Sequence, residues 1–96
     1  MTGLARTSAG LDERRRRLLF RSWRRGTREM DLIMGRFAEA VIAELNEAEI
    51  AEFERLSDVA DADLYAWLTG KEPVPADYDL PVFRRLRDFF TLRPIE

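Results

Sequence analysis

Hydrophobic residues recur at three- and four-residue steps along most of this chain, most clearly in residues 27–45. There the apolar positions follow i, i+3, i+4, i+7 and onward, as one face of an amphipathic helix requires. They are Met30, Ile33, Met34, Phe37, Ala38, Val41, Ile42 and Leu45. Each large side chain contributes about 1.5–3 kcal/mol when buried, so we expect this helix to be the spine of the core.

Two further helices are predicted close to this central helix. The one before it begins at Asp12, which can act as its N-cap, and it groups Leu18, Leu19, Ser22 and Trp23 on one side. The one after it begins at Asn46, because Asn46 and Glu49 have the spacing of a capping box. We expect it to end near Asp58.

The last third of the chain predicts two more helices. Asp61 can cap a short helix that Gly70 closes, since glycine readily takes a left-handed conformation. Residues 71–79 contain two prolines and are expected to be extended. A final helix is predicted from Leu80–Pro81 to Pro94, with an apolar stripe made of Val82, Leu86, Phe89 and Phe90.

No segment has the alternation or the β-branched content of a strand. The pattern therefore predicts an all-α fold, a small antiparallel bundle of five short helices. Residues 11–92 are expected to form a single domain, flanked by a flexible N-terminal tail at 1–10 and a C-terminal tail at 93–96.

The first two helices meet at a short corner whose residues fit a helix–turn–helix connection. Gly26 can adopt a positive φ, so one helix can stop there and the next can start at once. Thr27 can cap the second helix, and Glu29 and Asp31 fall in its first turn, where the helix dipole favours negative charge. Such a corner needs no function to explain it.

Charge is divided unevenly along the chain. Residues 1–36 carry a net charge of +6 and residues 37–96 a net charge of −8. Five arginines lie opposite the apolar side of the first helix: Arg14, Arg17, Arg21, Arg24 and Arg25. They can pair with the acidic second half, or they can meet an anionic partner. A nucleic acid fits less well, because Ser22 and Thr27 are the only nearby side chains suited to base edges.

Several chemistries are excluded by composition. The sequence contains neither cysteine nor histidine, which removes disulfides and the Ser-His-Asp and Cys-His mechanisms. Glycine-rich phosphate loops and calcium-loop spacings are absent too. No apolar run reaches the roughly 20 residues that span a bilayer. We therefore expect a soluble, intracellular protein without catalytic residues, without a metal site and without membrane insertion.

Two blocks of the sequence resemble the succinate dehydrogenase assembly factor 2 family, the small flavinylation factors of bacteria and mitochondria. The first is Arg-Gly-x-x-Glu, here Arg25, Gly26 and Glu29. Phe20-Arg-Ser-Trp23 precedes it, and Arg28-Glu-Met-Asp31 continues from it into the next helix. The second runs from Asp61 to Leu68 and is similar to the family's Asp-x-Asp-Leu-x-x-Trp-Leu segment. The resemblance covers roughly residues 11–90.

This resemblance implies a non-enzymatic assembly factor rather than an enzyme. Its client would be the flavoprotein subunit of succinate dehydrogenase and, in some members, of fumarate reductase. The factor would promote covalent attachment of FAD to a client histidine, so FAD would belong to the client and no cofactor would stay bound to the factor. The short segment before Leu11 favours a bacterial, cytoplasmic form. The residues expected to face the client are Arg21, Arg25, Gly26, Arg28, Glu29, Asp31 and Leu32.

Overall fold

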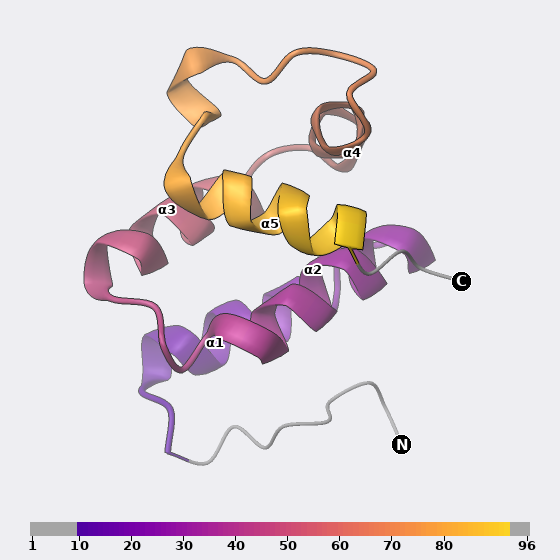
Figure 1. Ribbon diagram of the computed structural model, residues 1–96. Coiled ribbons are helices and arrows are strands. Elements are labelled where there is room, and N and C mark those ends of the chain that lie inside the picture. Colours follow the sequence, from indigo (N-terminus) through magenta and orange to yellow (C-terminus); the bar gives the residue numbers. More distant parts are fainter. Residues whose placement is uncertain (1–9, 93–96) are drawn as a thin grey trace.

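The computed structural model describes residues 10–92, which fold into five α-helices and one short 3-10 helix without a β-strand (Figure 1). The helices are α1 (Glu13–Ser22), α2 (Arg28–Val41), α3 (Glu47–Ser57), α4 (Asp61–Thr69), the 3-10 helix η1 (Ala76–Tyr78) and α5 (Pro81–Leu92). The predicted all-α fold is therefore confirmed for these residues. Apart from Gly10, both predicted tails and the proposed helix end at Pro94 lie outside the described residues.

Three of the predicted N-caps are present. Asp12 accepts a hydrogen bond from the Arg15 N–H, Thr27 accepts one from the Met30 N–H, and Asn46 forms the full capping box with Glu49. The prediction that Asp61 caps α4 is wrong. The N-cap is Ala60, which offers no side-chain acceptor, and Asp61 is the first helical residue with its carboxylate directed to an arginine.

Helices α1 and α2 form an antiparallel hairpin (Figure 1). At one end, the guanidinium group of Arg15 donates to the carbonyl oxygens of Ile42 and Leu45, just after α2. At the other end, the Trp23 indole packs on Gly35 so closely that a Cβ atom at position 35 would lie 2.2 Å from the ring. Helix α5 also runs antiparallel to α2, since Phe37 packs against Phe89 and Glu44 binds Arg85.

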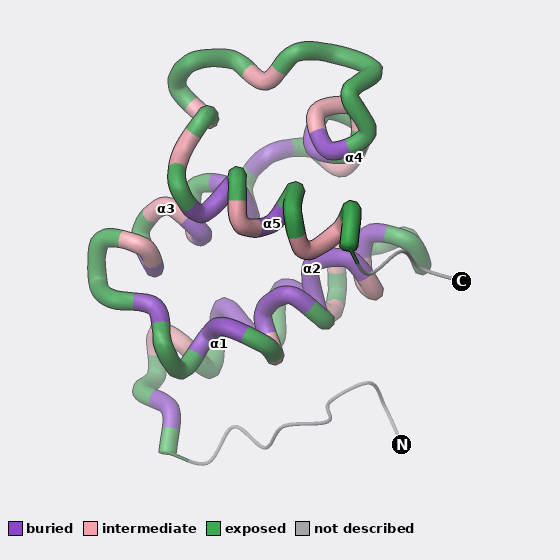
Figure 2. Tube along the Cα trace, in the orientation of Figure 1, coloured by how far each residue is buried: buried purple, intermediate pink, exposed green. Residues whose placement is uncertain are grey.

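The core lies between these helices and α3, and Figure 2 shows the buried positions along their facing sides. Phe37, Phe53 and Phe83 are its largest fully buried side chains. Helix α2 ends at Val41 rather than at Leu45, although Ile42 and Leu45 remain buried as the apolar period predicted.

The C-terminal third differs from the prediction in two details. The stripe predicted on α5 missed Phe83, which is fully buried, and Phe89 and Phe90 are only partly buried. The connection at 71–79 is not extended throughout, because it contains the 3-10 turn Ala76–Tyr78. Among the described residues, no helix is long and apolar enough to cross a membrane.

Candidate functional site: the α1–α2 corner

The corner between α1 and α2 is held by one carboxylate. Gly26 has φ +117°, in the region that favours glycine, as the sequence predicted. The backbone N–H groups of Arg25 and Gly26 both donate to Asp31 Oδ1, at 2.5 and 3.1 Å. Asp31 therefore ties the turn to the first turn of α2, a role that sequence spacing alone did not reveal.

Beyond this turn, α2 presents a charged surface to solvent. Gly26, Arg28 and Glu29 are exposed, and Leu32 is partly exposed. Arg36 lies two turns after Arg28 on the same helical face and is exposed as well. Within residues 10–92, none of Arg28, Glu29 and Arg36 makes an ion pair. We call Arg28, Glu29, Leu32 and Arg36 the open face of α2.

Arg25 is the one predicted site residue whose charged group lies inside the molecule. Its side chain is 9% exposed and pairs with Asp61 at 2.7 Å. The same guanidinium group donates to the carbonyl oxygens of Ser57 and Val59, at 2.5 and 2.6 Å. The two sequence blocks that carried the family resemblance are thus joined by this ion pair.

All five arginines of α1 form ion pairs within the chain. Arg14 binds Glu47 and Glu54 of α3, at 2.8 and 2.7 Å, and Arg21 binds Asp58 at 2.9 Å. The hydrogen bond from Arg14 also holds the pKa of Glu54 below its ordinary value of 4.5. For Arg14 and Arg21 the first of the two interpretations, pairing with the acidic second half, is confirmed, whereas Arg17 pairs with Glu13 of α1 itself.

Beside the corner, α1 exposes an aromatic side chain that the sequence analysis did not assign to the site. Phe20 is 53% exposed, and the Arg24 guanidinium carbon lies 3.8 Å from its ring centroid. The available signal was its position, because Phe20 falls outside the apolar side formed by Leu18, Leu19 and Ser22. An arginine stacked on an exposed ring is a typical component of a protein-binding surface.

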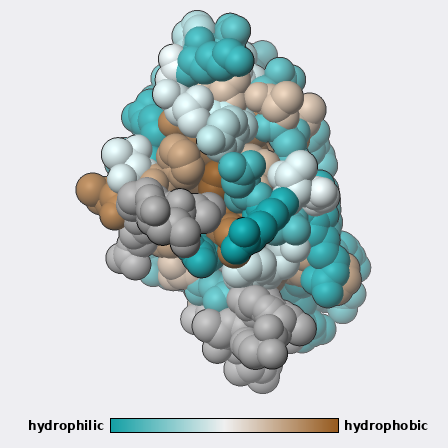
Figure 3. All heavy atoms as spheres, turned by 90° about the vertical axis from the view of Figure 1, so that its right-hand side faces the viewer, coloured by the Kyte–Doolittle hydropathy of each residue, from teal (hydrophilic) through white to brown (hydrophobic). Residues whose placement is uncertain are grey.

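The side of the molecule that carries the corner is shown in Figure 3. Hydrophilic residues cover most of it, and hydrophobic atoms reach the surface in a smaller central area.

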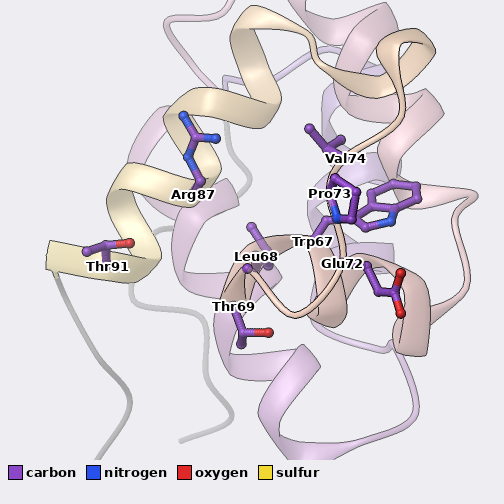
Figure 4. Close-up of a pocket in the computed structure, with 9 residues that line it drawn as sticks. Trp67, Leu68, Thr69, Glu72, Pro73, Val74, Arg87 and Thr91 are labelled. Carbon is purple, nitrogen blue, oxygen red and sulfur yellow. The ribbon is translucent and has the colours of Figure 1, made fainter.

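Two open cavities lie elsewhere. One, of about 380 Å³, lies between α4, the loop after it and α5, and Figure 4 shows Trp67, Pro73 and Val74 on one side of it and Arg87 on the other. The second, of about 260 Å³, lies between α2 and α5 beside Phe37 and Phe89. No group of three or more acidic residues among residues 10–92 is arranged to hold a metal ion.

The family assignment follows from sequence comparison. A family model described as the flavinator of succinate dehydrogenase matches residues 16–90, which include the corner, its partners on α3 and α4, and most of α5. This chain belongs to that family. The Arg-Gly-x-x-Glu resemblance at the corner is thereby placed in a match that covers nearly the whole domain.

Named relatives agree with the assignment. The chain is 38% identical to the FAD assembly factor SdhE of Acetobacter pasteurianus over 79% of its length and 70% of that protein. It is 35% identical to succinate dehydrogenase assembly factor 2-B, mitochondrial, of Drosophila ananassae, covering 86% of this chain. A mitochondrial assembly factor 2 of Saccharomyces cerevisiae is 32% identical over 90% of the chain. The chain spans only about half the length of these two mitochondrial relatives, 52% and 56%.

Proposed function

We propose that this chain is an assembly factor that binds the flavoprotein subunit of succinate dehydrogenase in the bacterial cytoplasm and promotes covalent attachment of FAD to it. The observation that carries the proposal is that Arg28 and Glu29, beside Gly26, are both exposed, in a chain that the flavinator family model matches over residues 16–90. The flavoprotein subunit of fumarate reductase is a second client of the same kind.

The proposal requires no reactive group on the factor. The sequence has neither histidine nor cysteine, and the exposed groups at the corner, a guanidinium and a carboxylate, are suited to recognition. A bound factor that prefers one client conformation shifts the client population toward it, by no more than the difference in affinity. If that conformation brings FAD and the accepting histidine into a near-attack geometry, the client's own chemistry accelerates.

In this proposal the site residues have two kinds of role. Gly26, Arg28, Glu29 and Leu32 face the client directly, because their side chains or backbone are open to solvent. Asp31 does not need to contact the client, because it holds the turn in place by accepting hydrogen bonds from the Arg25 and Gly26 N–H groups. Arg21, an exposed residue of α1, is already paired with Asp58.

In this proposal FAD belongs to the client, because the histidine that would accept it lies there: this sequence contains no histidine. The nucleic-acid alternative has less support, because Arg14, Arg21 and Arg25 are paired within the chain and interrupt the arginine stripe between residues 14 and 25.

The test is reconstitution of flavinylation with purified components. The apo flavoprotein subunit and FAD are incubated with and without this chain, and covalent flavin is read as in-gel fluorescence. We expect the wild-type chain to raise the rate and Glu29→Ala to lose that effect while keeping its helical circular-dichroism spectrum.

The matched control is Asp77→Ala, which removes another exposed carboxylate, on the 3-10 helix far from the corner (Figure 1). It should behave like the wild-type chain. Equal covalent flavin with and without the wild-type chain would overturn the proposed function, and full activity of Glu29→Ala would overturn the assignment of the site.

A further inference from the structure

Arg25 connects two corners of the fold that are far apart in sequence. Its Nε and Nη2 atoms lie 2.8 and 2.7 Å from Asp61 Oδ1, and its Nη atoms also bind the Ser57 and Val59 carbonyl oxygens. Ser57 is the last residue of α3 and Asp61 the first residue of α4. One side chain of the α1–α2 corner therefore spans the whole α3–α4 corner.

Arg25 donates to two carbonyl oxygens of the α3–α4 corner, in addition to the backbone bonds by which the Asp58 and Val59 N–H groups close the end of α3. The last carbonyls of a helix have no partner within the helix and carry a partial negative charge, which a guanidinium group complements. The first turn of α4 has no side-chain cap, because its N-cap is Ala60. Arg25 thus satisfies the Ser57 carbonyl at the end of α3, and its ion pair with Asp61 ties that end to the start of α4.

The backbone of Arg25 is fixed as well. Its N–H donates to Asp31 Oδ1, so the residue is held by α2 through its main chain and by α3 and α4 through its side chain. Gly26 follows directly and keeps its positive φ under this constraint. Glu29 follows in the first turn of α2, three residues after Gly26.

We propose that Arg25 and Asp61 are positioning residues, which lock the α1–α2 corner to the α3–α4 corner so that Gly26, Arg28 and Glu29 meet the client as part of one rigid surface. Arg25 does not touch the client, because its guanidinium group is buried and already bonded within the chain. This inference rests on the proposed function. It gives different roles to the two ends of the Arg-Gly-x-x-Glu block: Arg25 holds the fold in place from the interior, and Glu29 contacts the client at the surface.

Lysine cannot replace Arg25 in this role. The guanidinium group offers several N–H donors in a fixed plane, which suits one carboxylate and two carbonyls at once, whereas an ammonium group is a compact point charge. The geometry therefore predicts that Arg25→Lys loses the lock although it keeps the charge.

The first test uses the chain alone. Backbone hydrogen exchange at Gly26 and at position 25 reports whether the corner opens. We expect Asp61→Ala and Arg25→Lys to speed exchange at both amides, at a temperature where circular dichroism shows each variant fully folded. Asp63→Ala is the matched control, because Asp63 lies in the same first turn of α4 and is exposed. Unchanged exchange in Asp61→Ala would overturn the lock.

The second test is a double-mutant cycle on affinity for the flavoprotein subunit, with Arg25→Ala, Asp61→Ala and the double variant. If both residues act through one lock, each single variant should weaken binding by roughly 5- to 150-fold, and the double variant should be no worse than either. If Arg25 touched the client, Asp61→Ala would keep most of the affinity and the effects would add. That result would overturn the inference. Asp61→Asn, which retains an acceptor oxygen, replaces Asp61→Ala if the latter does not fold.

The two tests separate failure of the inference from failure of the proposed function. A wild-type chain that does not bind the flavoprotein subunit overturns the proposed function and, with it, the positioning role. The exchange experiment still decides in that case whether the two corners are locked. Faster exchange combined with unchanged client affinity would overturn the positioning role alone.

Discussion

Helices α1 and α2 carry arginines in very different states. On α1, Arg14 and Arg21 are bonded to acidic residues of the second half of the chain. On α2, Arg28 and Arg36 are exposed and have no ion pair among the described residues. The larger cluster of charge therefore holds the fold together, and the smaller one is available to a partner.

This difference shows that the number of charged residues in a segment is a poor guide to a binding surface. The four consecutive arginines at 14–17 are the most prominent feature of the sequence, yet Arg14 and Arg15 are only partly exposed and bind groups on other elements. What identifies a surface for a partner is charge that the fold leaves unpaired.

The largest expected effect comes from breaking the contact that seats α1 on α2. Gly35→Ala places a Cβ atom 2.2 Å from the Trp23 ring, so one helix must shift, and we expect a loss of about 1–3 kcal/mol in the free energy of unfolding. Helix propensity alone would give the opposite sign, since alanine is favoured over glycine by about 1 kcal/mol. Urea denaturation measures the change. A Gly35→Ala variant that is more stable than the wild-type chain would show that the contact is not tight.

The second effect is backbone strain at the corner. Gly26→Ala should cost about 1–2 kcal/mol in stability, because φ +117° is unfavourable for any residue with a Cβ atom. Nothing lies within 4 Å of that Cβ position, so Gly26→Arg should melt at about the same temperature as Gly26→Ala. It should bind the client much more weakly than Gly26→Ala does. Thermal melts and a pulldown of the flavoprotein subunit measure the two quantities. An arginine variant that melts far below the alanine variant would indicate a clash within the chain.

The third prediction contrasts the two helices directly. Arg28→Glu, on the open face of α2, should weaken client binding by roughly tenfold at low salt and by less at high salt, without a change in melting temperature. Arg14→Met, on α1, should lower the melting temperature and leave client binding unchanged, because Arg14 is bonded within the chain. Lys71→Glu makes the same charge change as Arg28→Glu at an exposed position in the loop after α4 and serves as the control. Equal losses of affinity for Lys71→Glu and Arg28→Glu would mean that net charge alone matters.

The smallest effect is on the pH dependence of stability. Hydrogen bonds from Arg14 to Glu54, from the Arg15 backbone N–H to Asp12 and from Arg84 to Asp79 lower the pKa of each carboxyl in the folded state. Such groups stabilise the fold above their unfolded pKa values, ordinarily 4.5 for Glu54 and 3.8 for the aspartates. This stability is lost as the pH falls through the lower folded values.

Urea melts at pH 7, 4 and 3 therefore should show a gradual loss of stability with acid. Glu54→Gln should slightly reduce the dependence of the unfolding free energy on pH. Glu72→Gln, at an exposed loop position, should leave that dependence unchanged. The sequence has no histidine, so we expect little change between pH 6 and 8. An identical acid slope in Glu54→Gln and the wild-type chain would show that the bond to Arg14 adds nothing.

Much of the fold could be predicted because it depends on local patterns. The apolar period of α2, the capping box at Asn46 and the turn at Gly26 are each set by residues a few positions apart. What the sequence did not reveal involves contacts over long separations. Asp61 looked like an ordinary cap until Arg25, from 36 positions earlier, was seen to bind it. Trp23 fitted an apolar side, but only the crossing of α1 and α2 shows why position 35 has no side chain.

For the predicted site, the sequence indicated a group of residues but not which of their side chains are buried. The resemblance indicated Arg25, Gly26 and Glu29 together, since a sequence motif does not distinguish a side chain that faces inward from one that faces outward. Burial makes the distinction, because the side chain of Arg25 is 9% exposed whereas Glu29 is exposed. Whether the predicted residues contact a client stays a prediction until the variants above are measured.

The chain has only two tryptophans, and they lie in different parts of the fold. Trp23 is next to the corner, with an indole N–H that is buried and lacks a hydrogen-bond partner among the described residues, whereas Trp67 belongs to α4 and packs on Tyr78. A Trp67→Phe chain would therefore contain a single tryptophan, beside the proposed docking surface. Its emission wavelength offers an optical readout of complex formation in real time, without an attached dye.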